Sequence, residues 1–306
     1  MQELIEKSLT QVGKVLVGKR HQIEQAVACL LAGGHLLIED LPGMGKTVLS
    51  QALARTLGLS FNRIQFTSDV LPADILGISV FDRDSGSFEF HPGPIFAQVL
   101  LADEINRTTP KTQSALLEAM EEAQVTVEGA TRPLPHPFFV IATQNPVTQA
   151  GTYPLPESQL DRFLMRIELG YPDAAAEREI IRGMDRRVML DQLEPCLDVD
   201  QLGSLQQQAA DIRVSDALLD YVQRLVQHSR QDPTFAWGLS PRGALALVRA
   251  ARAWALIRGR QHVIPEDVQA VLPAVVEHRL REHADHGRSG GEALAQRLLA
   301  VVDAVG

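Results

Sequence analysis

A glycine-rich turn between an apolar strand and an amphipathic helix constrains this chain more than any other feature. Residues 37–50 read LIEDLPGMGKTVLS and include Gly45, Lys46 and Thr47. This is the pattern of a phosphate-binding loop, in which glycines let the backbone wrap the phosphates and the helix N-terminus attracts them. The pattern usually has a glycine five positions before Gly45, where this sequence has Asp40. The turn predicts a nucleotide site, which tolerates Asp40 if its carboxylate points away from the phosphates.

Each side chain of this turn has an expected role in binding a nucleotide. Lys46 would neutralise the β- and γ-phosphates, and the Thr47 hydroxyl would bind Mg²⁺. The rest of the loop and the start of the helix would contact the nucleotide through Pro42, Gly43, Met44, Gly45 and Val48. A helix-entry turn with an incidental lysine is the alternative, and the remaining motifs decide between the two.

The first half of the chain alternates apolar strand-like runs with helix-like segments. Five strands are expected, at residues 34–40, 61–67, 97–103, 137–143 and 164–169. Residues 110–123 and 155–163 carry helical patterns between the later strands. Apolar strands that alternate with helices favour a parallel sheet that is covered on both faces.

Polar residues follow two of these strands at the point where each should end. Asp103 and Glu104 come directly after one apolar run, and Asn145 follows the next strand along the chain. The carboxyl ends of parallel strands open onto the same crevice as the phosphate loop. There Asp103 would bind Mg²⁺ and Glu104 would act as the general base for water. Asn145 could bridge the γ-phosphate and that water, although an Asn before proline also forms turns.

Two arginines are candidates for offsetting charge during phosphoryl transfer. Arg162 lies in the short helical segment before the last strand, and a salt bridge with Asp161 or a nearby acid is the alternative interpretation. Arg242 lies in the first turn of a predicted helix that Ser240 caps and Pro241 begins. A cation is unfavourable at the positive end of a helix, so Arg242 indicates that an anion lies nearby.

Two segments interrupt the alternation, and the second half of the chain is helical. Residues 78–92 and 124–136 predict hairpins, which would be surface features if they have no further role. Helical patterns cover residues 216–227, 241–257 and 265–280, with Pro273 expected to kink or break the last one. We therefore expect two domains, an αβα nucleotide-binding core over residues 1–172 and an all-helical domain over residues 173–306. His283 and His286 lie in a polar segment that is interpreted as a solvated loop rather than a metal site.

Together these motifs resemble the AAA+ ATPases, and more specifically the MoxR family. The resemblance is carried by EDLPGMGKT, PGPIFAQVLLADEINRTTPKTQSALLEAMEE, ATQNPVTQAGTYPLPESQLDRFLM and LSPRGALALVRAARAWA, and it spans roughly residues 10–280. It implies a P-loop parallel five-stranded sheet flanked by helices and followed by a smaller all-helical lid domain. Asp40 departs from the general AAA+ pattern but looks usual for the MoxR branch.

The resemblance also implies roles for individual residues. Lys46 and Thr47 match Walker A, Asp103 and Glu104 match Walker B, and Asn145 matches sensor 1. Arg162 matches the arginine finger, which reaches the nucleotide of a neighbouring subunit, and Arg242 matches sensor 2. Val17 and Gly18 match the segment that lines the adenine pocket, and the two hairpins match inserts that usually face the pore of a ring.

The same resemblance suggests cofactors and partners. It implies ATP and Mg²⁺, a homo-oligomer that is expected to be a hexameric ring, and a chaperone-like action on a protein client. A protein with a von Willebrand factor A domain is an expected partner.

Composition limits the other classes of function. The formal net charge is −9, which argues against broad attraction to nucleic acid. A nucleic-acid-associated AAA+ module stays open as an alternative, but it predicts basic inserts, and Arg83 and Arg132 are outweighed by acids there. A nucleotide-gated scaffold that does not hydrolyse ATP should lack Glu104 or Arg162, and a small GTPase should carry an Asn-Lys-x-Asp motif, which this sequence does not have.

Two further observations concern location. No apolar run approaches the roughly 20 residues that span a bilayer, and the N-terminal pattern predicts a helix rather than a secretion signal. The two cysteines have no metal-type spacing, so reduced thiols and a cytoplasmic location are expected.

Overall fold

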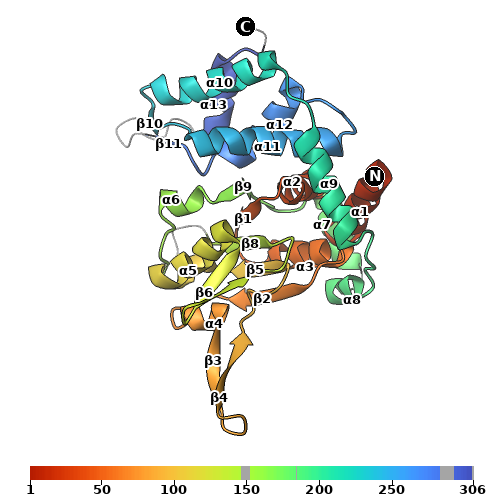
Figure 1. Ribbon diagram of the computed structural model, residues 1–306. Coiled ribbons are helices and arrows are strands. Elements are labelled where there is room, and N and C mark those ends of the chain that lie inside the picture. The colour runs from red at the N-terminus through yellow and green to blue at the C-terminus, as the bar shows by residue number, and fades with distance from the viewer. Residues whose placement is uncertain (146–151, 184, 283–292, 305–306) are drawn as a thin grey trace.

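A parallel sheet flanked by helices forms the lower part of the molecule, and a helical unit lies above it (Figure 1). The computed structural model describes residues 1–145, 152–183, 185–282 and 293–304. The sheet is five-stranded with the order β2-β5-β8-β1-β9, and all its strand pairs are parallel. Its strands are β1 (His35–Glu39), β2 (Phe61–Gln65), β5 (Val99–Asp103), β8 (Phe139–Gln144) and β9 (Phe163–Ile167). The predicted fold class is confirmed.

The register of these strands aligns the ends that carry the motifs. Glu39 pairs with Gln144, and Gln65 pairs with Asp103. Asp40, Glu104 and Asn145 therefore leave their strands at the same edge of the sheet. This alignment is what a site at the carboxyl ends of parallel strands requires.

Successive side chains of the sheet point to opposite faces and belong to two separate apolar clusters. Leu36 and Ile38 pack with the helices α1 (Gln2–Val15), α2 (Arg20–Leu31) and α3 (Lys46–Thr56). Leu37 packs on the other face with residues of α5 (Pro110–Glu122), next to the short α4 (Pro72–Leu76). Both faces are thus buried, and each fully buried leucine stabilises the fold by about 2 kcal/mol. The near-continuous apolar strands of the sequence follow from this double coverage.

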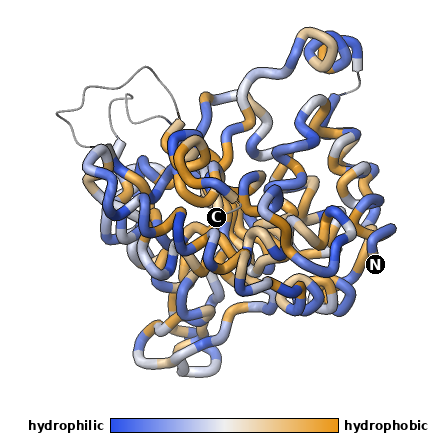
Figure 2. The backbone as a smooth tube through the Cα atoms, turned by 90° about the horizontal axis from the view of Figure 1, so that it is seen from above, coloured by the Kyte–Doolittle hydropathy of each residue, from blue (hydrophilic) through white to orange (hydrophobic). Residues whose placement is uncertain are grey.

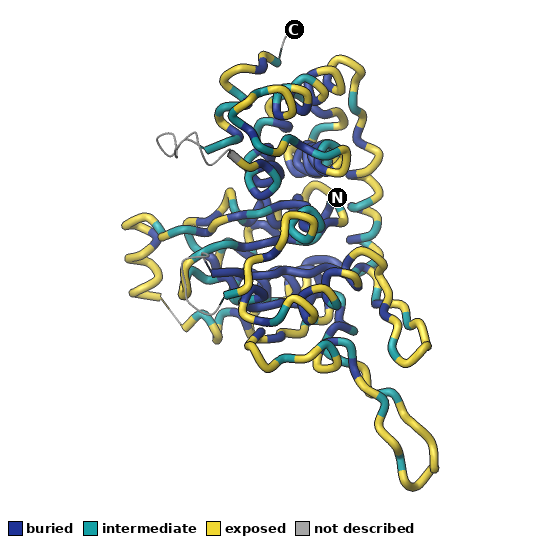
Figure 3. Tube along the Cα trace, turned by 90° about the vertical axis from the view of Figure 1, so that its left-hand side faces the viewer, coloured by how far each residue is buried: buried dark blue, intermediate teal, exposed yellow. Residues whose placement is uncertain are grey.

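Both predicted hairpins are present. One pairs β3 (Gly77–Asp82) with β4 (Ser87–Pro92), and the other pairs β6 (Gln124–Val127) with β7 (Ala130–Pro133). The second hairpin turns at Glu128 and Gly129, which both have positive φ angles, as a two-residue hairpin turn of this kind requires. The β3–β4 hairpin projects from the body of the molecule and is largely exposed (Figures 1 and 3).

The second half of the chain is helical, as predicted. Its helices are α7 (Ala174–Arg182), α8 (Arg186–Asp191), α9 (Val199–Asp211), α10 (Asp216–Gln231), α11 (Pro241–Ile257), α12 (Pro265–Val276) and α13 (Leu294–Val301). It adds one feature that the sequence did not predict, a small antiparallel sheet of β10 (Phe235–Trp237) and β11 (Arg281–Glu282). Figure 2 shows hydrophobic segments concentrated towards the middle of the molecule in that view.

Two predicted helices are shorter than expected. The segment at residues 155–163 forms only α6 (Glu157–Leu160), between the prolines at its start and the last strand. Helix α12 passes through Pro273 without a break and ends at Val276, four residues before the end of the predicted range. His283 and His286 lie outside the described residues. Among the described helices, none is long and apolar enough to cross a membrane.

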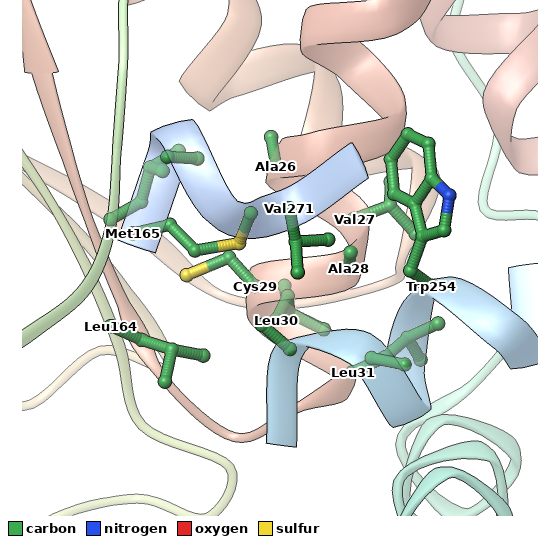
Figure 4. Packing of buried hydrophobic residues seen from close by; sticks show 14 of the residues in the cluster. Ala26, Val27, Ala28, Cys29, Leu30, Leu31, Leu164, Met165, Trp254 and Val271 are labelled. Carbon is green, nitrogen blue, oxygen red and sulfur yellow. The ribbon is translucent and has the colours of Figure 1, made fainter. Parts of the chain in front are cut away.

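The helical unit is joined to the sheet by an apolar contact. Figure 4 shows Cys29 on α2 beside Met165 of β9, with Val271 of α12 and Trp254 of α11 nearby. All four belong to one buried cluster that continues from the α1–α3 side of the sheet into the helical unit. The burial of Cys29 also raises the pKa of its thiol, so this cysteine behaves as a core residue.

Candidate active site

The glycine-rich loop has the backbone geometry that a phosphate site needs. Gly43 and Gly45 have φ angles of 86° and 92°, in a region that other residues rarely adopt. Helix α3 begins at Lys46, immediately after Gly45, so its free N–H groups and positive dipole end face the loop. The sequence prediction of a loop that enters a helix is confirmed, and the glycines are required by conformation.

The carboxylate of Asp40 points away from this loop. Its Oδ2 accepts hydrogen bonds from the backbone N–H groups of Leu169 (2.8 Å) and Gly170 (2.7 Å). Its Oδ1 accepts a third from the N–H of Leu41 at 2.8 Å. Asp40 therefore ties the start of the loop to the chain that follows β9, and its negative charge is directed at backbone donors rather than at the phosphate position.

Lys46, Asn145 and Glu104 form a connected group. The Lys46 Nζ donates to the backbone oxygen of Asp40 at 2.7 Å and lies 3.4 Å from Asn145 Oδ1. Asn145 Nδ2 donates to Glu104 Oε1 at 3.0 Å. Burial lowers the pKa of Lys46, while the carboxylates of Asp103, Asp40 and Glu104 act in the opposite direction. A buried Asn, 1% exposed, thus links the lysine that is expected to bind phosphate to the expected general base.

Thr143 positions the two acidic residues. Its Oγ donates to Asp103 Oδ1 at 2.6 Å and accepts the backbone N–H of Glu104 at 2.8 Å. Glu104 has a φ angle of 57°, which is uncommon for a residue other than glycine and is sustained only by its surroundings. Glu104 thus lies just beyond the end of β5, with its carboxylate within reach of Asn145.

Two arginines pair with the acidic residues. Arg63, on β2, lies 2.7 Å from Asp103 Oδ2 through its Nη2. Arg107, at the end of the short 3₁₀ turn Ile105–Arg107, lies 2.9 Å from Glu104 Oε2. Asn106, in the same turn, donates to the backbone oxygen of Asn145 at 3.1 Å. These contacts hold both carboxylates in defined orientations.

The residues at this edge fit Mg²⁺. Thr47 and Asp103 offer a hydroxyl and a carboxylate, and Mg²⁺ prefers oxygen ligands. Within the described residues no group of three or more His, Cys, Asp or Glu could hold a metal. A magnesium ion here would need phosphate and water oxygens to complete its coordination, as it usually does at nucleotide sites.

The segment expected to line an adenine pocket lies beside the loop. Val17 and Gly18 form the turn between α1 and α2, and Gly18 has a φ angle of 73°. A Cβ on Gly18 would lie 2.7 Å from the Cβ of Ala176 in α7, so no larger residue fits. A Cβ on Gly45 would lie 3.0 Å from a methyl of Leu16, the residue before this turn. The turn and the phosphate loop are therefore neighbours.

Arg162 and Arg242 come together in a different place. Both form ion pairs with Glu121, at the end of α5, through Arg162 Nη2 to Oε2 (3.1 Å) and Arg242 Nη2 to Oε1 (2.9 Å). The Ser240 side chain caps α11 and Pro241 is its first residue, as predicted. The anion near Arg242 within one chain is therefore a carboxylate.

The arginine pair lines a cavity of about 360 Å³. Four arginines and two carboxylates line it, so the lining carries a formal charge of +2; they are Arg162, Arg242, Arg249, Arg279, Glu121 and Asp161. The cavity also borders Gly33, Gly34 and His35, which lie at the amino end of β1. It suits an anionic group.

Arg279 fixes the helical unit to this part of the core. It is 5% exposed at its side chain and forms an ion pair with Asp161 Oδ1 at 2.7 Å. Its Nη2 donates to the backbone oxygen of Phe163, at the start of β9, at 2.6 Å. Burial lowers the pKa of Arg279, and the Asp161 carboxylate opposes that shift. The cavity is therefore built jointly by the core and the helical unit.

The phosphate loop and the arginine pair lie at opposite edges of the sheet. The loop follows the carboxyl end of β1, whereas the cavity borders its amino end. Six residues separate Gly34 from Asp40, which is about 20 Å in an extended strand. The arginines of one chain therefore do not reach a phosphate that is held by the loop of the same chain.

Comparisons with known proteins agree with this geometry. Residues 35–165 match a family described as "ATPase family associated with various cellular activities (AAA)", and residues 227–297 match an AAA lid domain. A solved structure from Cytophaga hutchinsonii, described as a candidate ATPase, superposes with a TM-score of 0.89 at 36% identity, over 99% of this chain and 95% of that one.

Two curated relatives cover most of the chain. The uncharacterised protein YeaC of Bacillus subtilis is 45% identical over 301 residues, 98% of this chain and 94% of that protein. Chaperone MoxR1 of Mycobacterium tuberculosis is 44% identical over 285 residues, 90% of this chain and 75% of that protein. The chain belongs to the MoxR family of AAA+ ATPases.

This MoxR-family ATPase has site residues that sequence reasoning missed. Thr143, Arg63 and Arg107 contact the acidic pair, and Glu121 holds the two arginines. Thr143 could have been found, because it lies near the end of β8, two residues before Asn145. Glu121 gave no signal, since an acidic residue at the exposed end of a helix is ordinary.

Proposed function

We propose that this MoxR-family protein binds ATP with Mg²⁺ and hydrolyses it. The observation that carries the proposal is the connected group of Lys46, Asn145 and Glu104 at the phosphate loop. Lys46 would offset the phosphate charge, while Thr47 and Asp103 would hold the Mg²⁺ that the reaction needs. Glu104 would accept the proton of the attacking water, and Asn145 would hold Glu104 towards the γ-phosphate.

The second part of the proposal is that each active site is shared by two copies of the chain. Arg162 and Arg242 lie at the edge of the sheet opposite the loop, which supports a role on the nucleotide of a neighbouring copy. A contact between two different edges of the same protein is head-to-tail and closes into a ring when the rotation permits. We propose a homo-oligomeric ring, expected to be a hexamer, in which both arginines act in trans.

The proposed role of the ring is the remodelling of a protein client. The β3–β4 hairpin exposes a set of apolar side chains, namely Ile78, Val80, Phe81 and Phe88, the last of them 73% exposed. Exposed apolar patches mark surfaces that bind other proteins. By resemblance to the family, the hairpins would face a central pore, and a protein with a von Willebrand factor A domain would be a partner.

The inserts favour a protein client over nucleic acid. The guanidinium of Arg132, in the second hairpin, lies 3.8 Å from the ring centre of Phe90 in the first. The same group also donates to the backbone oxygens of Val127 and Ala130. Arg132 therefore joins the two hairpins to each other, and it is not directed outward as a phosphate contact would require.

The division of the chain and its location belong to the same proposal. We place the nucleotide-binding core at residues 1–172 and the lid at residues 173–306. The reduced thiols expected of Cys29 and Cys196, which are both buried, are consistent with a cytoplasmic site of action.

The test is the substitution Glu104→Gln. The variant should bind ATP like the wild type and lose about 10²- to 10⁴-fold in turnover, because only the base is removed. Held in the ATP state, it should capture a protein client from a lysate, and Lys46→Ala should capture none. Undiminished phosphate release by Glu104→Gln would remove Glu104 from its role. Wild-type protein that binds ATP without releasing phosphate would support the scaffold alternative.

A further inference from the structure

The cavity at the arginine edge contains a residue with no assigned role. Glu121 lies in the last turn of helix α5, and each oxygen of its carboxylate pairs with a different arginine, Arg162 or Arg242. The two arginines come from distant parts of the chain, the start of β9 and the first turn of α11. One carboxylate therefore bridges the core and the lid at the point where both present a cation.

Two guanidinium groups that act on one phosphate repel each other. Without an anion between them, they would separate into solvent, since both are partly exposed and the end of α11 is itself positive. Glu121 offsets this repulsion and fixes the spacing of the pair. Because a carboxylate has two oxygens, it can hold both groups at once.

Glu121 can do this while the arginines keep donors for a phosphate. A guanidinium has five N–H groups, and in the part of the chain that the structure describes, each of the two arginines is paired only with Glu121. The remaining N–H groups of Arg162 and Arg242 are therefore available for a γ-phosphate. The formal charge of +2 on the cavity lining remains favourable for that anion.

We propose that Glu121 is a positioning residue that holds Arg162 and Arg242 together for the nucleotide of the neighbouring copy. The inference rests on the proposed shared site. Glu121 contacts no substrate, and it acts through the two arginines. Its loss should lower turnover by about tenfold or more and leave ATP affinity unchanged, because the binding loop lies at the other edge of the sheet.

The experiment is subunit mixing with Glu121→Ala. Glu121→Ala chains have an intact phosphate loop, and Glu104→Gln chains have intact arginines, so mixing the two should restore activity. Mixing Glu121→Ala with Arg162→Ala should restore none, because both chains lack a working arginine pair. In a double variant that carries both Glu121→Ala and Arg162→Ala, turnover should be little lower than in Arg162→Ala alone, because Glu121 acts through the arginines. A role of Glu121 in general folding would not produce this pattern.

Conservative and control variants complete the test. Glu121→Gln has one acceptor oxygen and should fall between wild type and alanine, which keeps the proposal testable if the alanine variant folds poorly. Glu122→Ala removes the same charge one residue later, where no pairing with either arginine exists among the described residues, and should behave as wild type.

Two outcomes would overturn the inference. One is turnover within about twofold of wild type in Glu121→Ala, and the other is recovery when Glu121→Ala is mixed with Arg162→Ala. If instead mixing Arg162→Ala with Glu104→Gln restores no turnover, the proposal of a shared site is refuted. The proposed role of Glu121 is then refuted with it.

Discussion

The two edges of the sheet in this protein differ in how their functional groups are held. At the loop edge, Lys46, Asn145 and Glu104 are linked to one another and are mostly buried. At the arginine edge, Arg162 and Arg242 are linked only through one exposed carboxylate among the described contacts, that of Glu121.

This difference indicates which parts of the proposed site one chain can form by itself. At the loop edge, Lys46, Asn145 and Glu104 already contact one another, and Thr143 holds Asp103 beside Glu104, so these groups are organised within one chain. The arginines of the other edge have no phosphate of their own chain within reach, so in the proposed ring they would act on the nucleotide of a second copy. The predictions below test the two edges separately.

The largest effect is expected at the loop edge. Lys46→Ala should reduce ATP affinity by at least about 100-fold, because the buried amine at the start of α3 is the main cation for the phosphates. Calorimetric titration with ATP measures it, with Lys7→Ala, which is exposed on α1, as the control. An unchanged ATP affinity would refute the assignment of the loop.

A smaller effect at the same edge should come from Thr143. Thr143→Val keeps the shape but removes the hydroxyl that serves Asp103 and Glu104, so turnover should fall about 10- to 100-fold. ATP affinity should change little, because Lys46 and the loop glycines are untouched. Steady-state phosphate release measures the turnover and calorimetric titration measures the ATP affinity, and Thr10→Val, on an exposed helix face, is the control. Turnover equal to wild type would show that the acidic pair does not depend on Thr143.

The arginine edge offers a test of stability against pH through His35. Its Nδ1 accepts the N–H of Val140 at 3.0 Å and its Nε2 lies 3.1 Å from the backbone oxygen of Met120, an arrangement that suits the neutral ring. Burial lowers the pKa of His35 to about 4. In an unfolded chain the value is about 6.5, so between these two values the unfolded state binds more protons and acid lowers the free energy of unfolding.

The expected contribution of His35 is on the order of 3 kcal/mol, lost as the pH falls from about 6.5 to 4. His35→Gln can keep both hydrogen bonds but does not titrate, so its stability should fall less over that range. Urea unfolding at the two pH values measures the difference, and the exposed His91→Gln is the control. An identical pH dependence in wild type and His35→Gln would contradict this account.

The loop edge was largely predictable from the sequence, and the arginine edge was not. Strand periodicity and the motif spacing placed Lys46, Asp103 and Asn145 at one edge, because parallel strands bring their carboxyl ends together. The direction of Asp40 depended on backbone donors 129 and 130 residues further along the chain, which no local pattern reveals. The Glu121 bridge and the β10–β11 sheet are likewise contacts between distant segments, so only the fold shows them.

The central claim, that each site is shared by two copies, is tested most directly by mixing two inactive variants. Arg162→Ala keeps an intact loop edge, and Glu104→Gln keeps an intact arginine edge. In a ring mixed at random from equal amounts, about a quarter of the sites should pair the loop of an Arg162→Ala chain with the arginines of a Glu104→Gln chain. Turnover should therefore return to roughly a quarter of the wild-type value. No recovery at any mixing ratio would show that the arginines do not complete the site of a neighbouring copy.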